Sequence, residues 1–361
     1  MESVEGLITD LSFYKGKRVF ITGHTGFKGT WLCKILVDAG AYVTGYALPP
    51  LTGQNIFSVA GVKEKMDSVI GDIRDRGQLF SVFEKAKPQI VFHLAAQPLV
   101  RDSYADPVKT YETNVMGTVH ILECVRLYAQ DVKSVLNITT DKVYKNNEWC
   151  WGYREDEPLD GFDPYSNSKS CAELVTHSYK NCFFADGTVA VSTARAGNVI
   201  GGGDFSKDRI IPDCVRAALS GKRIALRNAA SVRPYQHVLE PLFAYLLIAQ
   251  RQFEDPALAG YYNVGPDECD CISTGELADI FCRYWGEGLS RTEIKEIGAP
   301  HEATFLKLDC SRIKSRLGWR PRWNIEKAVE KTVEWTKAYR ARKDMAAVMN
   351  AQIEEYMADK V

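Results

Sequence analysis

The stretch Arg18-Val19-Phe20-Ile21-Thr22-Gly23-His24-Thr25-Gly26-Phe27-Lys28-Gly29 decides the fold, because it runs from a short apolar strand into a turn with three glycines and then opens a helix. Glycine lets the backbone turn tightly and approach a ligand closely. The unpaired N–H groups and the positive dipole end of a helix start attract phosphates. The alternative is an ordinary strand–turn–helix corner. We predict that this turn binds the pyrophosphate of a dinucleotide cofactor through Gly23, Thr25, Gly26, Phe27, Lys28 and Gly29.

The pattern that begins here continues along the chain as short β-branched runs that alternate with longer amphipathic stretches. Such alternation is typical of parallel strands joined by crossover helices. The runs are nearly continuous in apolar residues, which indicates strands covered on both faces. Strands are expected at 18–22, 42–46, 68–70, 90–94, 134–139 and 189–195. The sequence therefore predicts a doubly wound, mostly parallel, Rossmann-like α/β sheet.

The second half of the chain is less regular. A length of 361 residues can bury a large core as one big domain or as two lobes. Beyond Gly197 the alternation ends, and short strands mix with helices. We expect a dinucleotide-binding domain at 1–196, rejoined by segments near 233–241 and 261–265. Residues 197–361 would form mainly a smaller, interleaved α+β lobe that binds the substrate.

The composition excludes several classes of partner. Forty-five basic and 46 acidic residues give a formal net charge of -1, so the overall charge attracts neither nucleic acid nor an anionic membrane. Residues 1–6 carry no basic leader region, and no apolar stretch approaches the ~20 residues of a transmembrane helix. The ten cysteines are scattered, and the pair Cys269 and Cys271 has no second cysteine pair and no neighbouring histidines at ligand spacing. We expect a soluble, cytoplasmic protein with reduced thiols and with no bound metal, nucleic acid or membrane.

The ends of the second and third strands bear on the nucleoside half of the cofactor. Dinucleotide sites usually place an acid after the second strand to bind the ribose hydroxyls, but Ala47 stands there and no arginine replaces it for a 2′-phosphate. This position therefore does not distinguish NAD from NADP, and we expect weak retention of the cofactor on purification. After the third strand, Asp72 could bind the adenine amino group or cap the next helix, a role for which Asp75 is better placed.

The segment after the fourth strand is His93-Leu94-Ala95-Ala96-Gln97. Its small residues would let a flat cofactor lie against the backbone, so we assign Leu94, Ala95 and Ala96 to cofactor binding. Gln97, at the end of the segment, is assigned to the substrate. We predict that His93 is a hydrogen-bonded core histidine and not a catalytic group, because position alone does not give a histidine a titrating role.

Two further segments supply acid/base groups. Thr140-Asp141-Lys142 leave the fifth strand at the carboxyl edge of the sheet, where open α/β proteins bind ligands. In Tyr165-Ser166-Asn167-Ser168-Lys169, a helix would put Tyr165 and Lys169 one turn apart on the same face. A nearby ammonium favours the phenolate. We therefore expect Tyr165 to accept a proton from a hydroxyl near neutral pH while the carbon loses a hydride to a nicotinamide cofactor.

Taken in order, these motifs resemble those of the extended short-chain dehydrogenase/reductase family over nearly the whole chain. The matching segments are the glycine turn, Asp72-Ile73, His93-Leu94-Ala95-Ala96, Asn114-Val115-Met116-Gly117-Thr118 and the segment from Tyr165 to Lys169. Within this family, the acid/base pair after the strand-five threonine is similar to that of the nucleotide-sugar 4,6-dehydratases. The form Thr-Asp-Lys, together with 148–155, 195–204 and 233–241, resembles those that act on CDP-glucose. The resemblance implies NAD as cofactor, bound with help from Ile73 and Asn114.

The resemblance also implies an internal redox reaction, in which NAD takes a hydride from C4 of the glucosyl unit and returns it to C6 after water leaves. Tyr165, with Lys169 lowering its pKa, would take the C4 hydroxyl proton while Thr140 orients that hydroxyl. Asp141 would protonate the departing hydroxyl. Lys142 replaces the commoner glutamate, and a lysine is neutral at pH 7 only when its pKa is depressed. It would either act as a neutral base at C5 or stay charged and stabilise the enolate.

The diphosphate of the substrate needs cations and N–H donors. We expect Asn198, Arg209 and Arg233 to supply them, since arginine makes bidentate phosphate contacts. A surface ion pair is the alternative for each arginine. By resemblance, His301 would replace an arginine before the last phosphate-binding segment. Residues around Gln236 and His237 would bear on selectivity for cytosine.

Three alternatives stay open at this point. The chain could be a dehydratase for another nucleotide sugar, such as GDP-mannose or dTDP-glucose, a 4-epimerase, or a non-catalytic cofactor sensor. The intact tyrosine, lysine, threonine and aspartate set argues against the sensor. By resemblance alone, a homodimer or higher homo-oligomer would form through helices near 107–129 and 168–184.

Overall fold

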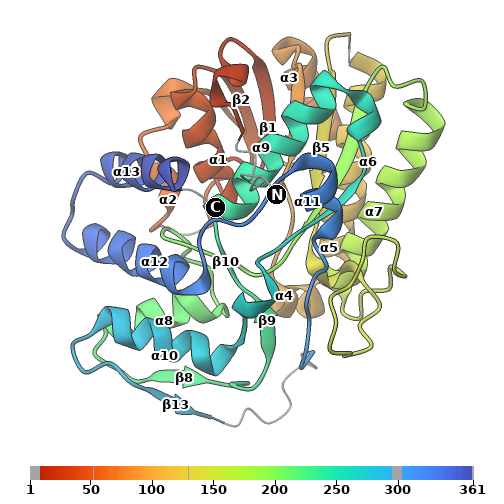
Figure 1. Cartoon of the computed structure of the whole chain (residues 1–361). Helices are drawn as coiled ribbons and strands as arrows, with labels where there is room; N and C mark the ends of the chain where they lie inside the picture. The colour runs from red at the N-terminus through yellow and green to blue at the C-terminus, as the bar shows by residue number, and fades with distance from the viewer. Residues whose placement is uncertain (1–8, 52, 129, 295–302, 360–361) are drawn as a thin grey trace, which may run out of the picture.

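A seven-stranded parallel sheet forms the centre of the computed structural model, which describes residues 9–51, 53–128, 130–294 and 303–359 (Figure 1). The strand order is β11-β6-β5-β4-β1-β2-β3, and every neighbouring pair is parallel. The strands are β1 (Arg18–Thr22), β2 (Tyr42–Ala47), β3 (Asp67–Ile70), β4 (Ile90–His93), β5 (Ser134–Ile138), β6 (Ala190–Ala196) and β11 (Tyr261–Val264). The predicted doubly wound α/β sheet is confirmed, and its six expected strands lie where the sequence placed them.

Helices cover both faces of this sheet. One face packs against α1 (Phe27–Asp38) and α9 (Leu239–Glu254), whose apolar side chains share a core with β1, β4 and β5. The other face packs against α3 (Arg76–Ala86) and α6 (Gly117–Tyr128), and α7 (Pro164–Phe183) lies next to α6. Because both faces are covered, β4 and β5 are buried along their whole length. This burial is the reason for their nearly continuous apolar sequence.

The chain beyond β6 builds a second, smaller core, which lies below the sheet in Figure 1. Its elements are β7 (Val199–Ile200), α8 (Ile210–Leu219), β8 (Ile224–Leu226), β9 (Val232–Pro234), β10 (Gln236–His237), β12 (Cys271–Ser273), α10 (Thr274–Trp285), β13 (Arg291–Glu293) and α12 (Ile325–Arg340). Strand β13 pairs with β8, and β12 pairs with β9. We refer to this part of the molecule as the second lobe.

The two segments that were expected to rejoin the main sheet differ in outcome. The segment near 261–265 does so as β11, parallel to β6. The segment near 233–241 does not, because β10 pairs with β7, which is separated from β6 by Gly197 and Asn198. Helix α9, which follows β10, is the element that returns the chain to the sheet and packs on β5 and β6.

The local sequence fixes the start of α7, the helix that carries two of the predicted acid/base residues. Asp163 caps the helix by accepting hydrogen bonds from Ser166 N at 3.0 Å and Ser166 Oγ at 2.6 Å. Pro164 occupies the first turn, where the missing N–H costs nothing. Tyr165 therefore lies in the first turn and Lys169 one turn further along.

The first turn of α9 contains a buried carboxylate that reaches three partners far away in the sequence. Glu240 accepts hydrogen bonds from Arg322 N at 3.0 Å, Trp323 N at 2.7 Å and Tyr356 Oη at 2.9 Å. Burial raises the pKa of Glu240 to about 7, although these hydrogen bonds oppose the rise. Tyr356 belongs to α13 (Met345–Ala358), so this carboxylate ties α13 to the helix that covers the sheet.

The remaining helices are short. They are α2 (Ile56–Val59), α4 (Val100–Ala105), α5 (Pro107–Tyr111) and α11 (Ser311–Leu317). In the part of the chain that the structure describes, no helix combines the length and the apolar character needed to cross a membrane.

Candidate active site

A cavity of about 570 Å³ opens where the carboxyl ends of β5 and β6 face the second lobe. One wall, which we call the sheet-side wall, includes Thr140, Asp141, Lys142 and Tyr165. The other, the lobe-side wall, includes Asn198, Arg209 and Arg233. The structure thus brings together residues that are distant in the sequence, at the edge where open α/β sheets bind ligands.

The triplet after β5 forms a tight 3-10 turn, Asp141–Val143, which Thr140 caps. Thr140 Oγ1 donates a hydrogen bond to Asp141 Oδ1 at 3.0 Å, whereas the buried Oδ2 has no partner among the described residues. Burial raises the pKa of the Asp141 carboxyl, and the charges of Lys142 and Arg233 oppose this rise. A raised pKa makes it easier for a carboxyl group to hold a proton that it can donate. Lys142 is half-buried in the same wall.

Tyr165 and Lys169 lie one turn apart on α7, as predicted, but their pKa values differ from the expectation. Burial raises the pKa of Tyr165 to about 12, although a hydrogen bond with Thr140 and the charge of Arg209 lower it. Lys169 Nζ donates to the Ile138 carbonyl at 3.0 Å, and burial lowers the pKa of Lys169 to about 8. The expected net lowering of the Tyr165 pKa is not found in this structure, because desolvation of the phenol outweighs the hydrogen bond with Thr140 and the charge of Arg209.

The glycine turn between β1 and α1 leaves no room for a side chain at Gly23 or at Gly29. Gly23 has a φ of +79°, in the left-handed region that glycine adopts freely. A Cβ on Gly29 would lie 2.1 Å from the Gly23 carbonyl oxygen, and one on Gly23 would lie 2.8 Å from Ala95 N. Gly26 caps α1 without a side-chain hydrogen bond, so the first N–H groups of the helix remain available to a ligand. These residues fit a pyrophosphate.

Lys28 brings a cation from this turn into the cavity, which Phe27 also lines. Its Nζ lies 5.8 Å from the ring centroid of Tyr245. Burial lowers the pKa of Lys28 to about 7, and the charges of Lys169 and Arg209 lower it further. This repulsion between cations indicates an excess of positive charge that an anionic ligand would relieve.

The segment after β4 is held by hydroxyl groups, and His93 is the core histidine that the sequence predicted. Its Nδ1 lies 2.7 Å from Thr22 Oγ1 and its Nε2 3.2 Å from Thr118 Oγ1. Burial lowers the pKa of His93 to about 3, with a smaller contribution from the charge of Lys169. Thr22 Oγ1 also accepts hydrogen bonds from the N–H groups of residues 94 and 95, both at 3.1 Å. Sequence reasoning missed Thr22, whose only signal is a hydroxyl at the last position of β1.

Asn114, which was assigned to the cofactor, makes scaffold contacts. Its Oδ1 accepts from Gln97 N at 2.8 Å, and its Nδ2 donates to the Gln97 carbonyl at 3.1 Å and to Ser168 Oγ at 2.9 Å. Asn114 therefore joins the segment after β4 to α7, next to Lys169. A direct contact between Asn114 and a cofactor stays a prediction.

The residues after β3 also have protein partners. The Asp72 carboxylate lies 2.7 Å from the Arg74 guanidinium, whose hydrogen bonds lower the pKa of Asp72. Asp75 caps α3 by accepting from Gln78 N at 3.0 Å, as predicted. Ile73 is buried at the start of this segment. The contacts of Asp72 and Ile73 with the adenosine half of a cofactor stay predictions.

The structure places Gln97 outside the cavity lining. Its side-chain amide donates to the Leu99 carbonyl at 3.1 Å and to Thr110 Oγ1 at 2.9 Å, and its Oε1 accepts from Leu99 N at 2.6 Å. The amide is thus occupied in shaping the loop before α4. A contact between Gln97 and the substrate stays a prediction.

Gln236 and His237 also lie outside the cavity lining. Gln236 is fully buried and donates to the Val264 carbonyl at 2.9 Å. His237 is fully buried too, with its ring centroid 4.8 Å from that of Trp323. Successive side chains of a strand point to opposite faces, so the burial of both residues means that both sides of β10 are covered. Their assignment to the substrate is corrected for this reason. The remaining candidate, His301, lies outside the described residues.

Arg209 and Arg233 both reach the cavity. Arg209 forms an ion pair of 3.1 Å with Asp204, and its side chain is about one-third exposed at 35%. Arg233 is mostly buried and donates to two main-chain carbonyls. Neither is a freely exposed surface ion pair, which was the alternative that the sequence left open.

Sequence reasoning missed two further arginines of this cavity, Arg101 and Arg227. Both lie near Asp208, at N–O distances of 3.9 Å and 2.9 Å respectively. They come from α4 and from the loop after β8, so no local spacing connects them to the site. Only a count of arginines without an assigned role could have drawn attention to them.

The chain matches the sequence model of the GDP-mannose 4,6-dehydratase family over residues 20–332. It is 47% identical over 355 residues to the CDP-glucose 4,6-dehydratase of Salmonella typhimurium, a match that covers 97% of this chain and 98% of the relative. It is also 27% identical over 333 residues to a probable dTDP-glucose 4,6-dehydratase of Sinorhizobium fredii, covering 88% and 92% of the two chains.

Solved structures resemble the whole chain. An epimerase from Methanothermobacter thermautotrophicus superposes with a TM-score of 0.81 at 23% identity, covering 92% of this chain and 95% of the other. The dTDP-glucose 4,6-dehydratase of Bacillus anthracis, solved in complex with NAD, gives a TM-score of 0.75 at 22% identity and covers 92% and 99%. At these identities the likeness establishes the fold.

Proposed function

Since the chain belongs to the GDP-mannose 4,6-dehydratase family of extended short-chain dehydrogenases/reductases, we propose that it is an NAD-dependent hydro-lyase that converts CDP-glucose to CDP-4-keto-6-deoxyglucose and water. The observation that carries this proposal is the sheet-side wall, where Thr140, Asp141 and Tyr165 meet in one cavity. The 47% identity to a CDP-glucose enzyme over nearly the full length supports the choice of nucleotide sugar.

The residues of the glycine turn would hold NAD. The tight approach of Gly23 and Gly29 and the uncapped start of α1 suit its pyrophosphate, and Lys28 adds a positive charge. When bound, NAD supplies the group that accepts a hydride from the sugar and later returns it. Asp72 would bind the adenine, and Leu94, Ala95 and Ala96 would form a flat wall beside the cofactor.

The first task of the site is to remove the proton of the C4 hydroxyl. Tyr165 Oη is the proposed base, and Thr140 would hold the hydroxyl by a hydrogen bond. Because the pKa of Tyr165 is about 12 in this structure, the phenolate needs positive charge close by. The Lys169 ammonium and the Arg209 guanidinium are the protein groups that supply it.

The second task is to eliminate water. A ketone at C4 acidifies the C5–H bond, because the electron pair can delocalise as an enolate. Lys142 would take the C5 proton, or would stabilise the enolate if it stays charged. The C6–O bond then breaks while Asp141 gives its proton to the departing hydroxyl. Return of the hydride to C6 and of a proton to C5 completes a reaction with no net oxidation.

The role of Lys142 can be decided with two variants. If Lys142 is the base, Lys142→Met abolishes the exchange of the C5 proton with solvent, whereas Lys142→Glu retains dehydration because a carboxylate accepts a proton at neutral pH. The measurement is deuterium incorporation at C5 by NMR in heavy water. Undiminished exchange in Lys142→Met would leave Lys142 the electrostatic role alone.

The test of the proposed function is turnover. Purified protein with NAD is incubated separately with CDP-glucose, dTDP-glucose, GDP-mannose and UDP-glucose. We expect a 6-deoxy-4-keto product from CDP-glucose, detected by NMR and mass spectrometry. A 4-epimer in place of the keto sugar, or preference for another nucleotide, would contradict the proposal.

The substrate diphosphate would bind to the lobe-side wall. Asn198, Arg209 and Arg233 line this wall together with Arg227, and arginine matches phosphate geometry with two parallel hydrogen bonds. A contact of His301 with the substrate stays a prediction, because this residue lies outside the described part of the chain.

We also propose a homodimer that forms through α5, α6 and α7. These helices expose large apolar side chains, with Val108 at 68%, Leu127 at 45%, Leu174 at 56% and Phe183 at 51%. Clustered exposed apolar groups mark association surfaces. Leu174→Glu should shift the mass measured by light scattering to that of a monomer, whereas Leu51→Glu, at an exposed site outside these helices, should not.

The cytoplasm is the proposed location. The ten cysteines are all free thiols, which persist in a reducing compartment. Fractionation of cells with an antibody against the untagged protein tests this proposal, and recovery with the membrane or exported fraction would contradict it.

A further inference from the structure

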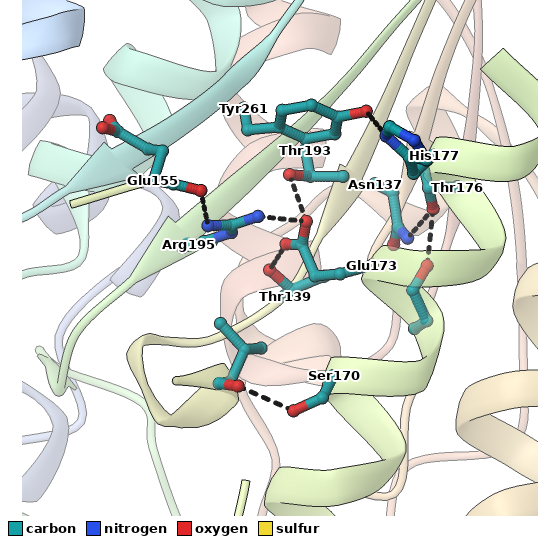
Figure 2. A network of polar contacts seen from close by, with 12 residues as sticks. Asn137, Thr139, Glu155, Ser170, Glu173, Thr176, His177, Thr193, Arg195 and Tyr261 are labelled. Atoms are coloured by element: carbon teal, nitrogen blue, oxygen red, sulfur yellow. Dashed lines mark hydrogen bonds and ion pairs between the residues drawn. The ribbon is translucent and has the colours of Figure 1, made fainter. Parts of the chain in front are cut away.

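The turn that contains residues 140–142 is held at both ends by the two halves of one buried ion pair. We call these residues the acid/base turn. Before it, Thr139 Oγ1 donates a hydrogen bond to Glu173 Oε1. After it, Tyr144 Oη accepts a hydrogen bond from Arg195 Nη1 at 2.9 Å. Figure 2 shows Glu173 between Thr139 and Arg195, with the ion pair at the centre of a polar network.

The ion pair is isolated from water. The side chains of Glu173 and Arg195 are 0% and 3% exposed, and the Nη2–Oε2 distance is 2.9 Å. Thr193 Oγ1 donates to the same Oε2 at 2.8 Å, so the Glu173 carboxylate joins α7, β5 and β6 at one point. Although burial alone would lower the pKa of Arg195, Glu173 raises it above its ordinary value. Loss of either partner would leave a buried charge without compensation.

Side chains of α7 also donate hydrogen bonds to the main chain on each side of the acid/base turn. Lys169 Nζ donates to the Ile138 carbonyl at 3.0 Å, and Ser170 Oγ donates to the Val143 carbonyl at 2.8 Å. Glu173 lies one turn beyond Lys169 on the same helix. The helix that carries Tyr165 is therefore joined to the acid/base turn through three successive contacts.

Tyr144 also contacts the edge strand of the main sheet. Tyr144 Oη donates to Asn263 Oδ1 at 2.6 Å, and Asn263 belongs to β11. Arg195 Nη1 donates in addition to the Glu155 carbonyl at 2.8 Å. Tyr144, two residues after the acid/base turn, is thus fixed to Arg195 and Asn263, neither of which lines the cavity.

We propose that the Glu173–Arg195 ion pair is a positioning unit, and that its link through Thr139 holds the acid/base turn in register with Tyr165. The proposal rests on the proposed function and extends it. Glu173 and Arg195 do not line the cavity, so they act through Thr139 and Tyr144. Proton transfer at C5 and C6 requires near-contact geometry, and a displacement of about 1 Å can lower a rate by about 10²-fold.

The test uses variants that leave the ion pair intact, because Glu173→Gln or Arg195→Met would leave an unpaired charge and could fail to fold. Thr139→Val removes the hydroxyl that links the ion pair to the turn. Thr193→Val is the matched control, since it removes a hydroxyl of the same kind from the same carboxylate without touching the turn. Thr139→Ser restores the hydroxyl.

We expect Thr139→Val to lower the kcat of dehydration by about tenfold to hundredfold, with little change in the KM for CDP-glucose. Thr193→Val should keep kcat within about threefold of the wild type, although its loss of thermal stability should be similar to that of Thr139→Val. Thr139→Ser should recover the wild-type kcat. Equal losses in Thr139→Val and Thr193→Val, or a loss in Thr139→Ser as large as in Thr139→Val, would overturn the proposal. A change in KM alone would overturn it as well.

A second measurement does not depend on the reaction. Hydrogen exchange of the backbone amides in a peptide that spans 140–145, measured by mass spectrometry, reports the rigidity of the turn. Exchange should be faster in Thr139→Val than in Thr193→Val and the wild type. Equal exchange would overturn the positioning role, even for an active enzyme. Absence of dehydration by the wild type would instead refute the proposed function, and the exchange comparison would still decide the role of the ion pair.

Discussion

The two walls of the cavity differ in how deeply their charged groups are buried. On the sheet-side wall, Asp141 is 1% exposed and Thr140 is 6% exposed, and burial dominates the protonation of Asp141. On the lobe-side wall, the side chains of Arg209 and Arg227 are 35% and 29% exposed and are paired with aspartates. Desolvation shifts the pKa values of groups that must exchange protons. Partly solvated arginines, in contrast, can replace a carboxylate partner with a phosphate. We infer that one wall performs chemistry and the other binds.

The largest expected effect comes from the sheet-side wall. Tyr165→Phe removes the proposed base at C4, so turnover should fall by about 10³-fold. Binding of the cofactor and of CDP, measured by calorimetry, should change by less than about threefold. A variant that retains a tenth or more of the wild-type rate would show that another group removes the proton.

Asp141→Asn should have the next largest effect. The amide cannot give a proton to the departing hydroxyl, so the loss of water from C6 should slow by about 10²-fold. Oxidation at C4 should persist, because Tyr165 is unchanged. The measurement is rapid-quench analysis of the sugar, and equal slowing of both steps would contradict a separate acid role for Asp141.

A substitution in the lobe-side wall should weaken substrate binding and leave the rate of the chemical steps nearly unchanged. Arg227→Ala removes a proposed charged donor to the substrate diphosphate, so the KM for CDP-glucose should rise by about tenfold with kcat within about twofold of the wild type. Arg283→Ala is the control, because Arg283 forms an exposed ion pair with Glu326 outside the cavity lining. A fall in kcat at unchanged KM for Arg227→Ala would contradict the distinction between the two walls.

The smallest expected effect is on the pH profile. Burial lowers the pKa of Lys169 to about 8, so its ammonium is present below pH 8 and is lost as the pH rises through that value. Loss of this charge disfavours the Tyr165 phenolate, and kcat should be about halved at pH 8 and fall further above it. Lys169→Arg keeps its charge at these pH values. An unchanged alkaline limb in Lys169→Arg would mean that another group titrates there.

The sheet-side wall could be predicted from the sequence because its groups are local. A strand followed by Thr140-Asp141-Lys142 places these residues at the carboxyl edge, and the spacing from Tyr165 to Lys169 places both on one helical face. The pKa of Tyr165 could not be predicted, because it depends on side chains that come from other elements. The sequence also contains an indication of the Glu173–Arg195 ion pair. Glu173 stands one helical turn after Lys169, and the oppositely charged Arg195 lies within a buried strand.

The lobe-side wall was less accessible to sequence reasoning. The arginines of the cavity come from α4, the residue before α8, the loop after β8 and strand β9, and only the fold brings them together. Gln236 and His237 were misplaced because a two-residue strand gives no periodicity from which the buried face can be read. The glycine turn, in contrast, could be predicted from the sequence, because the close approach of Gly23 and Gly29 depends only on neighbouring backbone.

The hydrogen bonds of Glu240 give the molecule an order of assembly. Tyr356 is made 116 residues after Glu240, and chains are synthesised at about 5–20 residues per second. During those seconds α9 can cover β5 and β6, but its carboxylate lacks the donors that it has in the finished protein. A chain that ends before α13 would contain every residue that lines the cavity, but its Glu240 carboxylate would lack the Tyr356 hydroxyl as a donor.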